Sequence, residues 1–161
     1  MKEKISNFSK VKENYLKFIK SQEILGEPFR NKLGQLNNFY IPISKLINEN
    51  YLHNKKPRII GLAGGQGSGK STISLILKKI LKVKYNLDTV VFSIDDFYKT
   101  HKERKKMSDT MSHLFLTRGV PGTHDSKKLY KCLKNLKKNY FKKILIPRFD
   151  KSIDDRFAKK K

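Results

Sequence analysis

The sequence predicts an α/β fold in which helices cover both faces of a parallel β-sheet, giving three αβα layers. A short apolar run at residues 58–63 is broken by a glycine-rich stretch, and a helical apolar pattern follows at 70–81. A second β-rich run occupies residues 89–94. Strand, glycine loop, helix and strand in this order form a βαβ unit, which implies parallel strands and a right-handed crossover.

The segment before this unit is predicted to be helical. Residues 6–20 place five apolar side chains on one helical stripe: Phe8, Val11, Tyr15, Phe18 and Ile19. A second short helix is predicted to begin at Pro42 and to bury Ile43, Leu46 and Ile47. Residues 48–56 resemble a polar linker, so we divide the chain into a helical prefix, 1–56, and a core, 57–161.

The last part of the chain contains one more predicted helix, at residues 127–138. Either Asp125 or Ser126 caps it, and its inward face comprises Leu129, Cys132, Leu133 and Leu136. A short apolar run follows at 144–147.

The net charge of +23 is compatible with an anionic partner but does not by itself indicate one. The lysines are spread through most of the chain instead of clustering with aromatic residues, so a nucleic-acid partner is not favoured. No apolar run is long enough to span a membrane, and the N-terminus lacks the apolar segment of a leader. The single Cys132 cannot form an internal disulfide. These features predict a cytoplasmic protein, with the oligomeric state open.

The glycine-rich stretch fits the phosphate-binding pattern G-x-x-x-x-G-K-S/T of P-loop NTPases. Glycines let backbone N–H groups approach phosphate oxygens, and the following helix begins at its positive end. Lys70 is expected to act on the β- and γ-phosphates, and the Ser71 hydroxyl to bind Mg²⁺. The predicted ATP-binding residues are Gly64, Gly65, Gln66, Gly67, Ser68, Gly69, Lys70, Ser71 and Thr72.

Two carboxylates, Asp95 and Asp96, directly follow the second β-rich run. Ligands of parallel α/β sheets bind beyond the carboxyl ends of the strands, so these residues should face the same crevice as the P-loop. A carboxylate there can accept a hydroxyl proton or hold Mg²⁺. Alternatively, one Asp caps the next turn and the other is solvated.

A P-loop followed by a strand that ends in D-x-F-Y resembles the uridine kinase, phosphoribulokinase and pantothenate kinase group. Two further segments, RGVPGTHD at 118–125 and PRFDKS at 147–152 followed by Asp155-Arg156, are similar to the D-glycerate 3-kinase family. The YIPI segment at 40–43 is also similar, and the resemblance covers about residues 40–156.

This resemblance implies that Asp95 is the general base on the glycerate hydroxyl, or a Mg²⁺ ligand together with Ser71, and that Lys70 and Asp95 are catalytic. It also implies a hydroxy-acid acceptor site, in which guanidinium groups suit a carboxylate. The implied acceptor residues are Asp96, Tyr98, Arg118, His124, Asp125, Arg148, Asp150, Lys151 and Arg156.

The chain departs from this family in two ways. The spacing between Ser152 and Asp155 is short, and the sequence ends before the E-G-W strand and lid that the family carries. We therefore expect a kinase core that is incomplete on its C-terminal side.

The preferred function is ATP-dependent phosphorylation of D-glycerate. Kinases for uridine, pantothenate or ribulose 5-phosphate remain alternatives, as does a non-catalytic remnant that binds nucleotides or nucleic acid.

Overall fold

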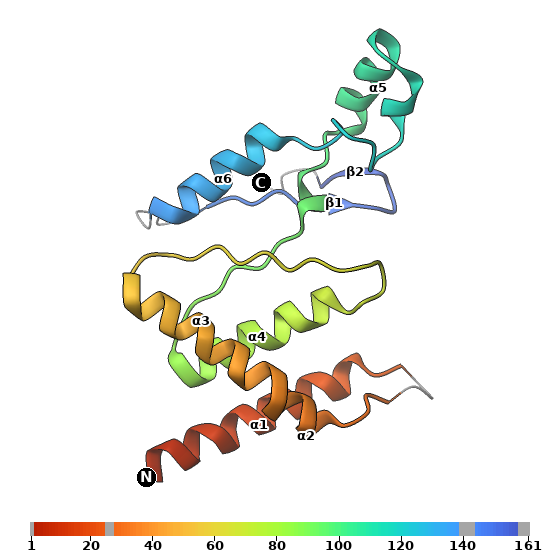
Figure 1. The fold of residues 1–161 in the computed structure, drawn as a ribbon. Helices are drawn as coiled ribbons and strands as arrows, with labels where there is room; N and C mark the ends of the chain where they lie inside the picture. The colour runs from red at the N-terminus through yellow and green to blue at the C-terminus, as the bar shows by residue number, and fades with distance from the viewer. Residues whose placement is uncertain (1, 25–27, 139–143, 158–161) are drawn as a thin grey trace. The chain divides into compact units, whose positions relative to one another are not determined.

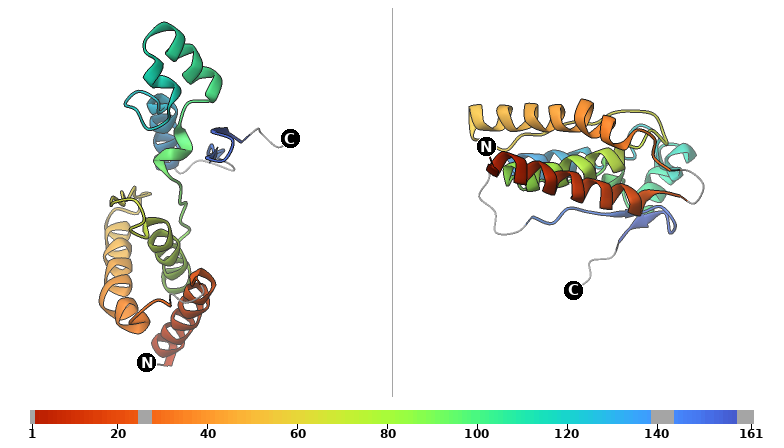
Figure 2. Two further views of the ribbon diagram at one scale, coloured as in Figure 1. Left: turned by 90° about the vertical axis from the view of Figure 1, so that its right-hand side faces the viewer. Right: turned by 90° about the horizontal axis from the view of Figure 1, so that it is seen from below.

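The computed structural model describes residues 2–24, 28–138 and 144–157, which fall into two compact units, 1–91 and 92–161 (Figures 1 and 2). The first unit contains α1 (Lys2–Gln22), α2 (Lys32–Gln35), the π-helical turn η1 (Leu36–Tyr40), α3 (Ile41–Asn54) and α4 (Lys70–Tyr85). The second contains η2 (Ile94–Phe97), α5 (His101–Thr110), η3 (His113–Leu116), α6 (Ser126–Lys138), β1 (Phe149–Asp150) and β2 (Asp155–Arg156).

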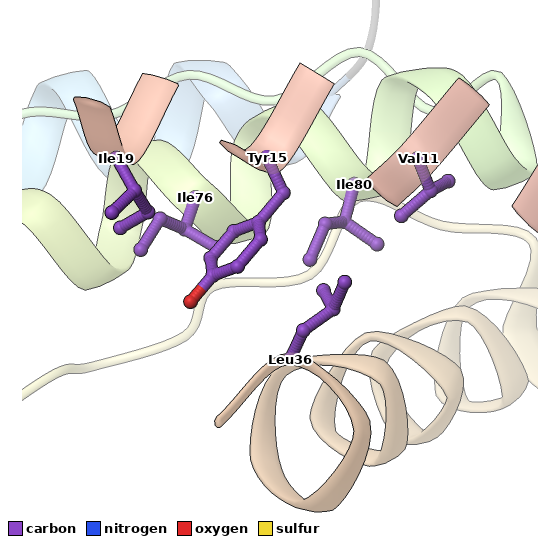
Figure 3. Close-up of a cluster of buried hydrophobic side chains, with 6 residues drawn as sticks. All are labelled: Val11, Tyr15, Ile19, Leu36, Ile76 and Ile80. Atoms are coloured by element: carbon purple, nitrogen blue, oxygen red, sulfur yellow. The ribbon is translucent and has the colours of Figure 1, made fainter. Parts of the chain in front are cut away.

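The core of the first unit is where α1, η1 and α4 meet (Figure 3). Its fully buried members are Val11, Tyr15, Ile19, Leu36, Ile76 and Ile80. This confirms the helical stripes for Val11, Tyr15 and Ile19 in the first helix and for the helix after the glycine loop, but Phe8, predicted on the same stripe, is exposed. Each such side chain contributes about 1.5–3 kcal/mol when it leaves water. The helix that carries the P-loop lysine is therefore anchored along its length by α1.

Tyr15 brings a hydroxyl into this core. Its Oη donates a hydrogen bond to the backbone oxygen of Lys32 at 3.0 Å, which joins α1 to α2. Burial, with a smaller effect of neighbouring Tyr40, raises the pKa of Tyr15 to about 12. The phenol therefore stays protonated and able to donate throughout the physiological pH range.

The prediction for α3 was wrong in two respects. The helix runs to Asn54, through most of the expected linker, and ends where Lys55 adopts a left-handed conformation with φ 48°. Its buried side is also different. Ser44 is fully buried and donates to the Ile41 backbone oxygen, whereas Ile43 and Leu46 are exposed. Positions 41 and 44 lie on the same helix face, and Ile41 packs against the core. The face that carries Ile43 and Leu46 therefore points to solvent.

Neither predicted strand is part of a hydrogen-bonded sheet within the described residues. Segments 58–63 and 89–93 have no ladder there, and four of their apolar side chains are about half-exposed: Ile59, Ile60, Leu62 and Val90. A strand is fixed by ladder bonds to a neighbour, and none is supplied to them in the described part of the chain. At the end of the second segment, Ser93 begins a 3₁₀ turn that takes Ile94 out of the expected strand.

The second unit is organised around η2. Phe97 is fully buried there, and its ring meets Phe92 edge-on with centroids 5.5 Å apart. Helix α6 and strand β1 both contact η2. Of the two predicted caps of α6, Asp125 is the one that accepts from the helix, because its Oδ1 receives the Lys128 N–H at 3.0 Å. Cys132 is buried on the predicted inward face.

Strands β1 and β2 form an antiparallel hairpin in which Phe149 pairs with Arg156 and Asp150 with Asp155. Each strand has only two residues, so ladder bonds alone do little to hold the hairpin. Its side chains bind to η2, α5 and the 118–125 segment instead, as described below.

Candidate functional site

The glycine loop has the backbone that phosphate binding requires. Gly67 and Gly69 have φ of 76° and 77°, a left-handed conformation that side chains disfavour. Gly69 is also the N-cap of α4, and its carbonyl accepts from Ile73 N at 2.9 Å. The loop therefore leads directly into a helix N-terminus, where unpaired N–H groups and the helix dipole favour an anion.

The Lys70 side chain folds back over this loop. Its Nζ donates to the backbone oxygens of Gly64 at 2.8 Å and Gly65 at 2.5 Å. Ser71 and Thr72 follow in the first turn of α4, and the Ser71 side chain is exposed. An ammonium and a hydroxyl are thus available at the loop, where a nucleotide phosphate and its metal ion would need them.

In the second unit, the two neighbouring aspartates differ in their surroundings. The Asp96 carboxylate is buried and accepts from Ser93 N at 2.9 Å, Arg148 Nη1 at 3.1 Å and Phe149 N at 3.4 Å. It completes a capping box on η2 and ties that turn to the hairpin. The carboxylate of Asp96 is thus bound by groups of the protein itself, which agrees with the alternative in which one Asp caps the turn.

Asp95 is half-buried and faces the hairpin instead. Its Oδ2 lies 2.8 Å from Lys151 Nζ, in the turn between β1 and β2. Burial alone would raise the pKa of Asp95, but the hydrogen bond and charge of Lys151 outweigh it, with smaller effects of Tyr98 and His124. The pKa of this carboxyl is therefore below its ordinary value, and the group is ionised at neutral pH.

The 118–125 segment is joined to the residues that follow η2. Lys99 N donates to Thr123 O and Asp125 N donates to Phe97 O, both at 2.8 Å, around a bridge between Tyr98 and His124. The Tyr98 and His124 rings stack with centroids 4.1 Å apart. His124 Nε2 is buried without a hydrogen-bond partner among the described residues.

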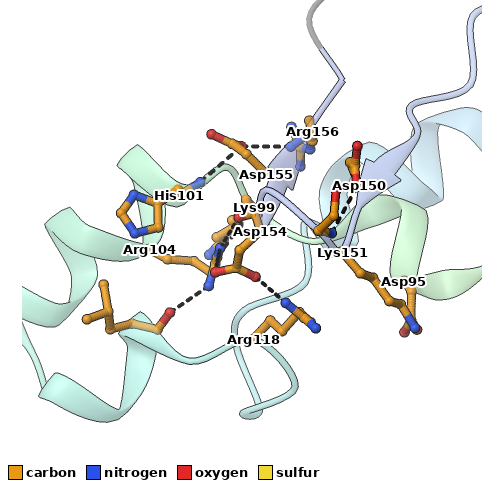
Figure 4. A network of polar contacts seen from close by, with 12 residues as sticks. Asp95, Lys99, His101, Arg104, Arg118, Asp150, Lys151, Asp154, Asp155 and Arg156 are labelled. Carbon is orange, nitrogen blue, oxygen red and sulfur yellow. Dashed lines mark hydrogen bonds and ion pairs between the residues drawn. The ribbon is translucent and has the colours of Figure 1, made fainter.

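The hairpin supplies three of the predicted acceptor residues, Asp150, Lys151 and Arg156 (Figure 4). Arg156 donates to Tyr98 O at 2.7 Å and to Asp125 Oδ2 at 3.2 Å, so it joins the two earlier motifs. Asp150 accepts from the backbone and the hydroxyl of Ser152. Three sequence motifs far apart in the chain thus meet in one cluster of charged side chains.

The nine residues predicted for the acceptor side all lie in the second unit, together with Asp95, whereas the P-loop residues lie in the first. Two members of the cluster were missed in the sequence. Arg104 on α5 is fully buried, and Asp154 in the hairpin turn is paired with it (Figure 4). Arg104 lies among the lysines of α5, and the sequence gives no signal that this one cation is buried.

The oxygen ligands predicted for Mg²⁺ are chemically suitable. Mg²⁺ prefers hard oxygen donors and keeps several waters, so one hydroxyl and one carboxylate with substrate phosphates suffice. The described residues contain no group of three or more His, Cys, Asp and Glu that could hold a metal ion. The assignment of Mg²⁺ to Ser71, and to Asp95 if it is not the base, stays a prediction.

In the described part of the chain, no helix has the length and apolar character needed to cross a membrane.

A loop with left-handed glycines, a lysine bound back onto it and a helix that begins at that lysine define the class of P-loop nucleotide-binding proteins. Within that class, this chain belongs to the Phosphoribulokinase / Uridine kinase family, whose family model matches residues 59–161.

Two yeast proteins are similar to the same region. "Uncharacterized kinase mug58" of Schizosaccharomyces pombe is 40% identical over 99 residues, covering 60% of this chain and 35% of the relative. "Probable ATP-dependent kinase TDA10" of Saccharomyces cerevisiae is 37% identical over 107 residues, covering 62% of this chain and 37% of the relative. The chain thus spans little more than a third of the length of these curated relatives.

The solved structure of the YGR205w protein is similar over 76% of this chain and 46% of its own, with a TM-score of 0.63 and 34% identity. The family and this structural neighbour confirm the predicted P-loop α/β fold class. They also confirm the resemblance to the uridine kinase and phosphoribulokinase group. None of these similarities selects glycerate among the acceptors of such kinases, and the boundary predicted at residue 56 stays a prediction.

Proposed function

We propose that this chain supplies the ATP-binding loop and the acceptor-binding side of an ATP-dependent small-molecule kinase, and that its acceptor is the hydroxy acid D-glycerate. The observation that carries the proposal is the pairing of Asp95 with Lys151 inside a cluster of cationic side chains. Asp95 offers an ionised base, and the cations around it suit an acceptor that is itself an anion.

The nucleotide half of the reaction is assigned to the loop. The N–H groups of residues 64–72 would bind the phosphates, and Lys70 would exchange its two carbonyl contacts for phosphate oxygens. Ser71 would hold Mg²⁺, which neutralises charge on the transferred group, and Asp95 would act as the base rather than as a second ligand.

The acceptor half is assigned to the second unit. The acceptor hydroxyl oxygen would form a bond to the γ-phosphorus while the bond from that phosphorus to the bridging oxygen of ADP breaks. The hydroxyl proton would pass to Asp95, and because Lys151 engages Oδ2, the recipient would be Oδ1. Arg118 would bind the acceptor carboxylate, with His124 and Tyr98 forming the wall beside it.

The remaining predicted acceptor residues would act mainly by holding this arrangement. Arg148 is bound to Asp96, Arg156 to Asp125, and Asp150 to the Ser152 turn. Their substitution would disturb the acceptor site through the fold of the second unit.

The experiment is ATP consumption by the full chain, with D-glycerate, uridine, pantothenate and ribulose 5-phosphate as separate acceptors. Turnover with D-glycerate alone is the expected result, and turnover with another acceptor would overturn the choice of glycerate. The family's description names both phosphoribulokinase and uridine kinase, so ribulose 5-phosphate and uridine are the second candidates. No turnover with any of them, together with steeply salt-dependent RNA binding, would favour a non-catalytic basic protein instead.

Two variants test the residue roles in the same assay. Lys70→Ala should weaken ATP binding by roughly tenfold or more, whereas Lys78→Ala, an exposed lysine further along α4, should bind ATP as the unaltered chain does. Asp95→Asn should reduce turnover far more than ATP affinity. Equal losses of both in Asp95→Asn would indicate that this carboxylate is only structural.

A further inference from the structure

The most deeply buried charge in the second unit is a residue to which no role has yet been assigned. Arg104 is fully buried on α5, and burial of an ion is costly unless it is paired and hydrogen-bonded. Its donors are used on backbone oxygens of Lys99 at 3.3 Å, Leu116 at 2.5 Å and Asp154 at 2.6 Å. It forms an ion pair with the Asp154 carboxylate, Oδ2, at 2.8 Å.

Asp154 is held in an unusual backbone conformation to make these contacts. Its φ is 52°, in the left-handed region that few residues other than glycine, asparagine and aspartate adopt. This conformation turns both its carbonyl oxygen and its carboxylate toward Nη2 of Arg104. Arg104 thus holds Asp154 both through its backbone oxygen and through one carboxylate oxygen.

The other carboxylate oxygen of Asp154 holds Arg118 (Figure 4). Arg118 Nη1 lies 2.6 Å from Asp154 Oδ1, and this is the only side-chain hydrogen bond of Arg118 among the described residues. About a third of the Arg118 side chain is exposed. Burial and the neighbouring Asp95 raise the pKa of the Tyr98 phenol, and the charges of Lys151 and Arg118 act in the opposite direction. Arg118 therefore acts on Tyr98, which is itself one of the groups that influence Asp95.

We propose that Asp154 is a positioning residue for the acceptor: anchored by the buried Arg104, it fixes the guanidinium of Arg118 to bind the acceptor's anionic group. The inference rests on the proposed function for the identity of that group. The three residues form a chain from the interior to the surface, with two cations sharing one carboxylate. The cluster keeps a net positive charge, and the donors of Arg118 that do not face Asp154 remain available to a ligand.

The test uses the full chain labelled with ¹⁵N-arginine. Restricted rotation of a guanidinium gives separate Nη–H signals in NMR spectra, and a freely rotating guanidinium gives averaged ones. Arg118, identified by loss of its signal in Arg118→Lys, is expected to be restricted in the unaltered chain and averaged in Asp154→Asn. Asparagine tolerates the left-handed conformation, so this variant removes the charge while it keeps the backbone. Asp109→Asn, an exposed residue on α5, is the matched control.

The same variants are then titrated with D-glycerate and, separately, with ATP. Asp154→Asn should weaken D-glycerate binding by roughly tenfold and leave ATP binding unchanged. In Arg118→Lys, the further change Asp154→Asn should have little effect, because the residue that it positions is already gone. Should Asp154→Asn fail to fold, Arg104→Met/Asp154→Asn removes the buried pair together and takes its place.

The outcomes separate the two proposals. Averaged Arg118 signals in the unaltered chain, or unchanged D-glycerate binding in Asp154→Asn, would overturn the positioning role while the proposed function stands. If the unaltered chain binds no D-glycerate but Arg118 is restricted and is released by Asp154→Asn, the choice of acceptor fails and the positioning role is supported.

Discussion

Lys151 Nζ lies 2.8 Å from Asp95 Oδ2, so the turn of the β1–β2 hairpin is bound to the residue proposed as the base. The pair is partly open to solvent on both sides, with 61% of the Lys151 and 38% of the Asp95 side chain exposed. Its contribution to stability is therefore screened and small. Its main effect is on the proton affinity of Asp95.

Lys151→Met should shift the ionisation of Asp95 to higher pH. Burial raises the pKa of this carboxyl, and Lys151 is the main group that lowers it, so removal of the lysine should raise the pKa. A ¹³C-carboxyl NMR titration of Asp95 measures this directly, and the acidic limb of the turnover profile should move the same way. Lys105→Met, an exposed lysine on α5, is the control. An unmoved Asp95 titration would show that the pair does not persist in solution.

Gly69→Ala should destabilise the first unit by about 1 kcal/mol, since alanine pays for the left-handed conformation that glycine adopts freely. Gly65→Ala is the matched control within the same loop. Gly65 is outside the left-handed group, and an added Cβ would meet nothing within 4 Å. Urea denaturation without nucleotide compares the two. Equal stability losses would mean that, without nucleotide, Gly69 does not keep its left-handed conformation.

Ile80→Ala should destabilise the first unit by about 2–4 kcal/mol, because it opens a cavity where α1, η1 and α4 meet. Leu75→Ala on the same helix removes a side chain that is 37% exposed and should cost much less. Chemical denaturation followed by circular dichroism measures both. A cost below 1 kcal/mol for Ile80→Ala would contradict the packing of α4 on α1.

Asp96→Ala should lower the stability of the second unit by about 1–3 kcal/mol, because it leaves Ser93 N and Phe149 N without their acceptor. Asp109→Ala, at an exposed position, should change stability by less than about 0.5 kcal/mol. Thermal unfolding compares the two. If Asp96→Ala is as stable as the unaltered chain and loses only acceptor binding, Asp96 contacts the acceptor and its role is not structural.

Helices α1 and α4 were predictable because their evidence is local, whereas α5 was not predicted. The stripe of Val11, Tyr15 and Ile19 and that of Ile76 and Ile80 follow the helical period, and they are the residues that the core buries. The inward face of α3 was not predictable, because the choice between Ser44 and its apolar neighbours depends on where α4 lies. The two apolar runs have strand-like sequences, but a ladder depends on a neighbour that a local pattern does not specify.

The site was predictable to the level of motifs. Resemblance selected the segments that contain Asp95, Arg118, His124 and Lys151, and the structure brings these segments together. Their partners were missed. Arg104 and Asp154 have no distinctive sequence context, and their importance comes from burial and from a left-handed backbone, which only the folded chain defines.

The two halves of the proposed site differ in how far along the chain their contacts reach. Lys70 contacts backbone five and six residues away, whereas Arg104 reaches Asp154 across 50 residues and Arg156 reaches Tyr98 across 58. Closing such long loops costs entropy that two-residue strands barely offset. Local opening of the hairpin would therefore release Lys151 and Arg118 together while the phosphate loop stays formed. On heating, acceptor binding should accordingly be lost at a lower temperature than nucleotide binding.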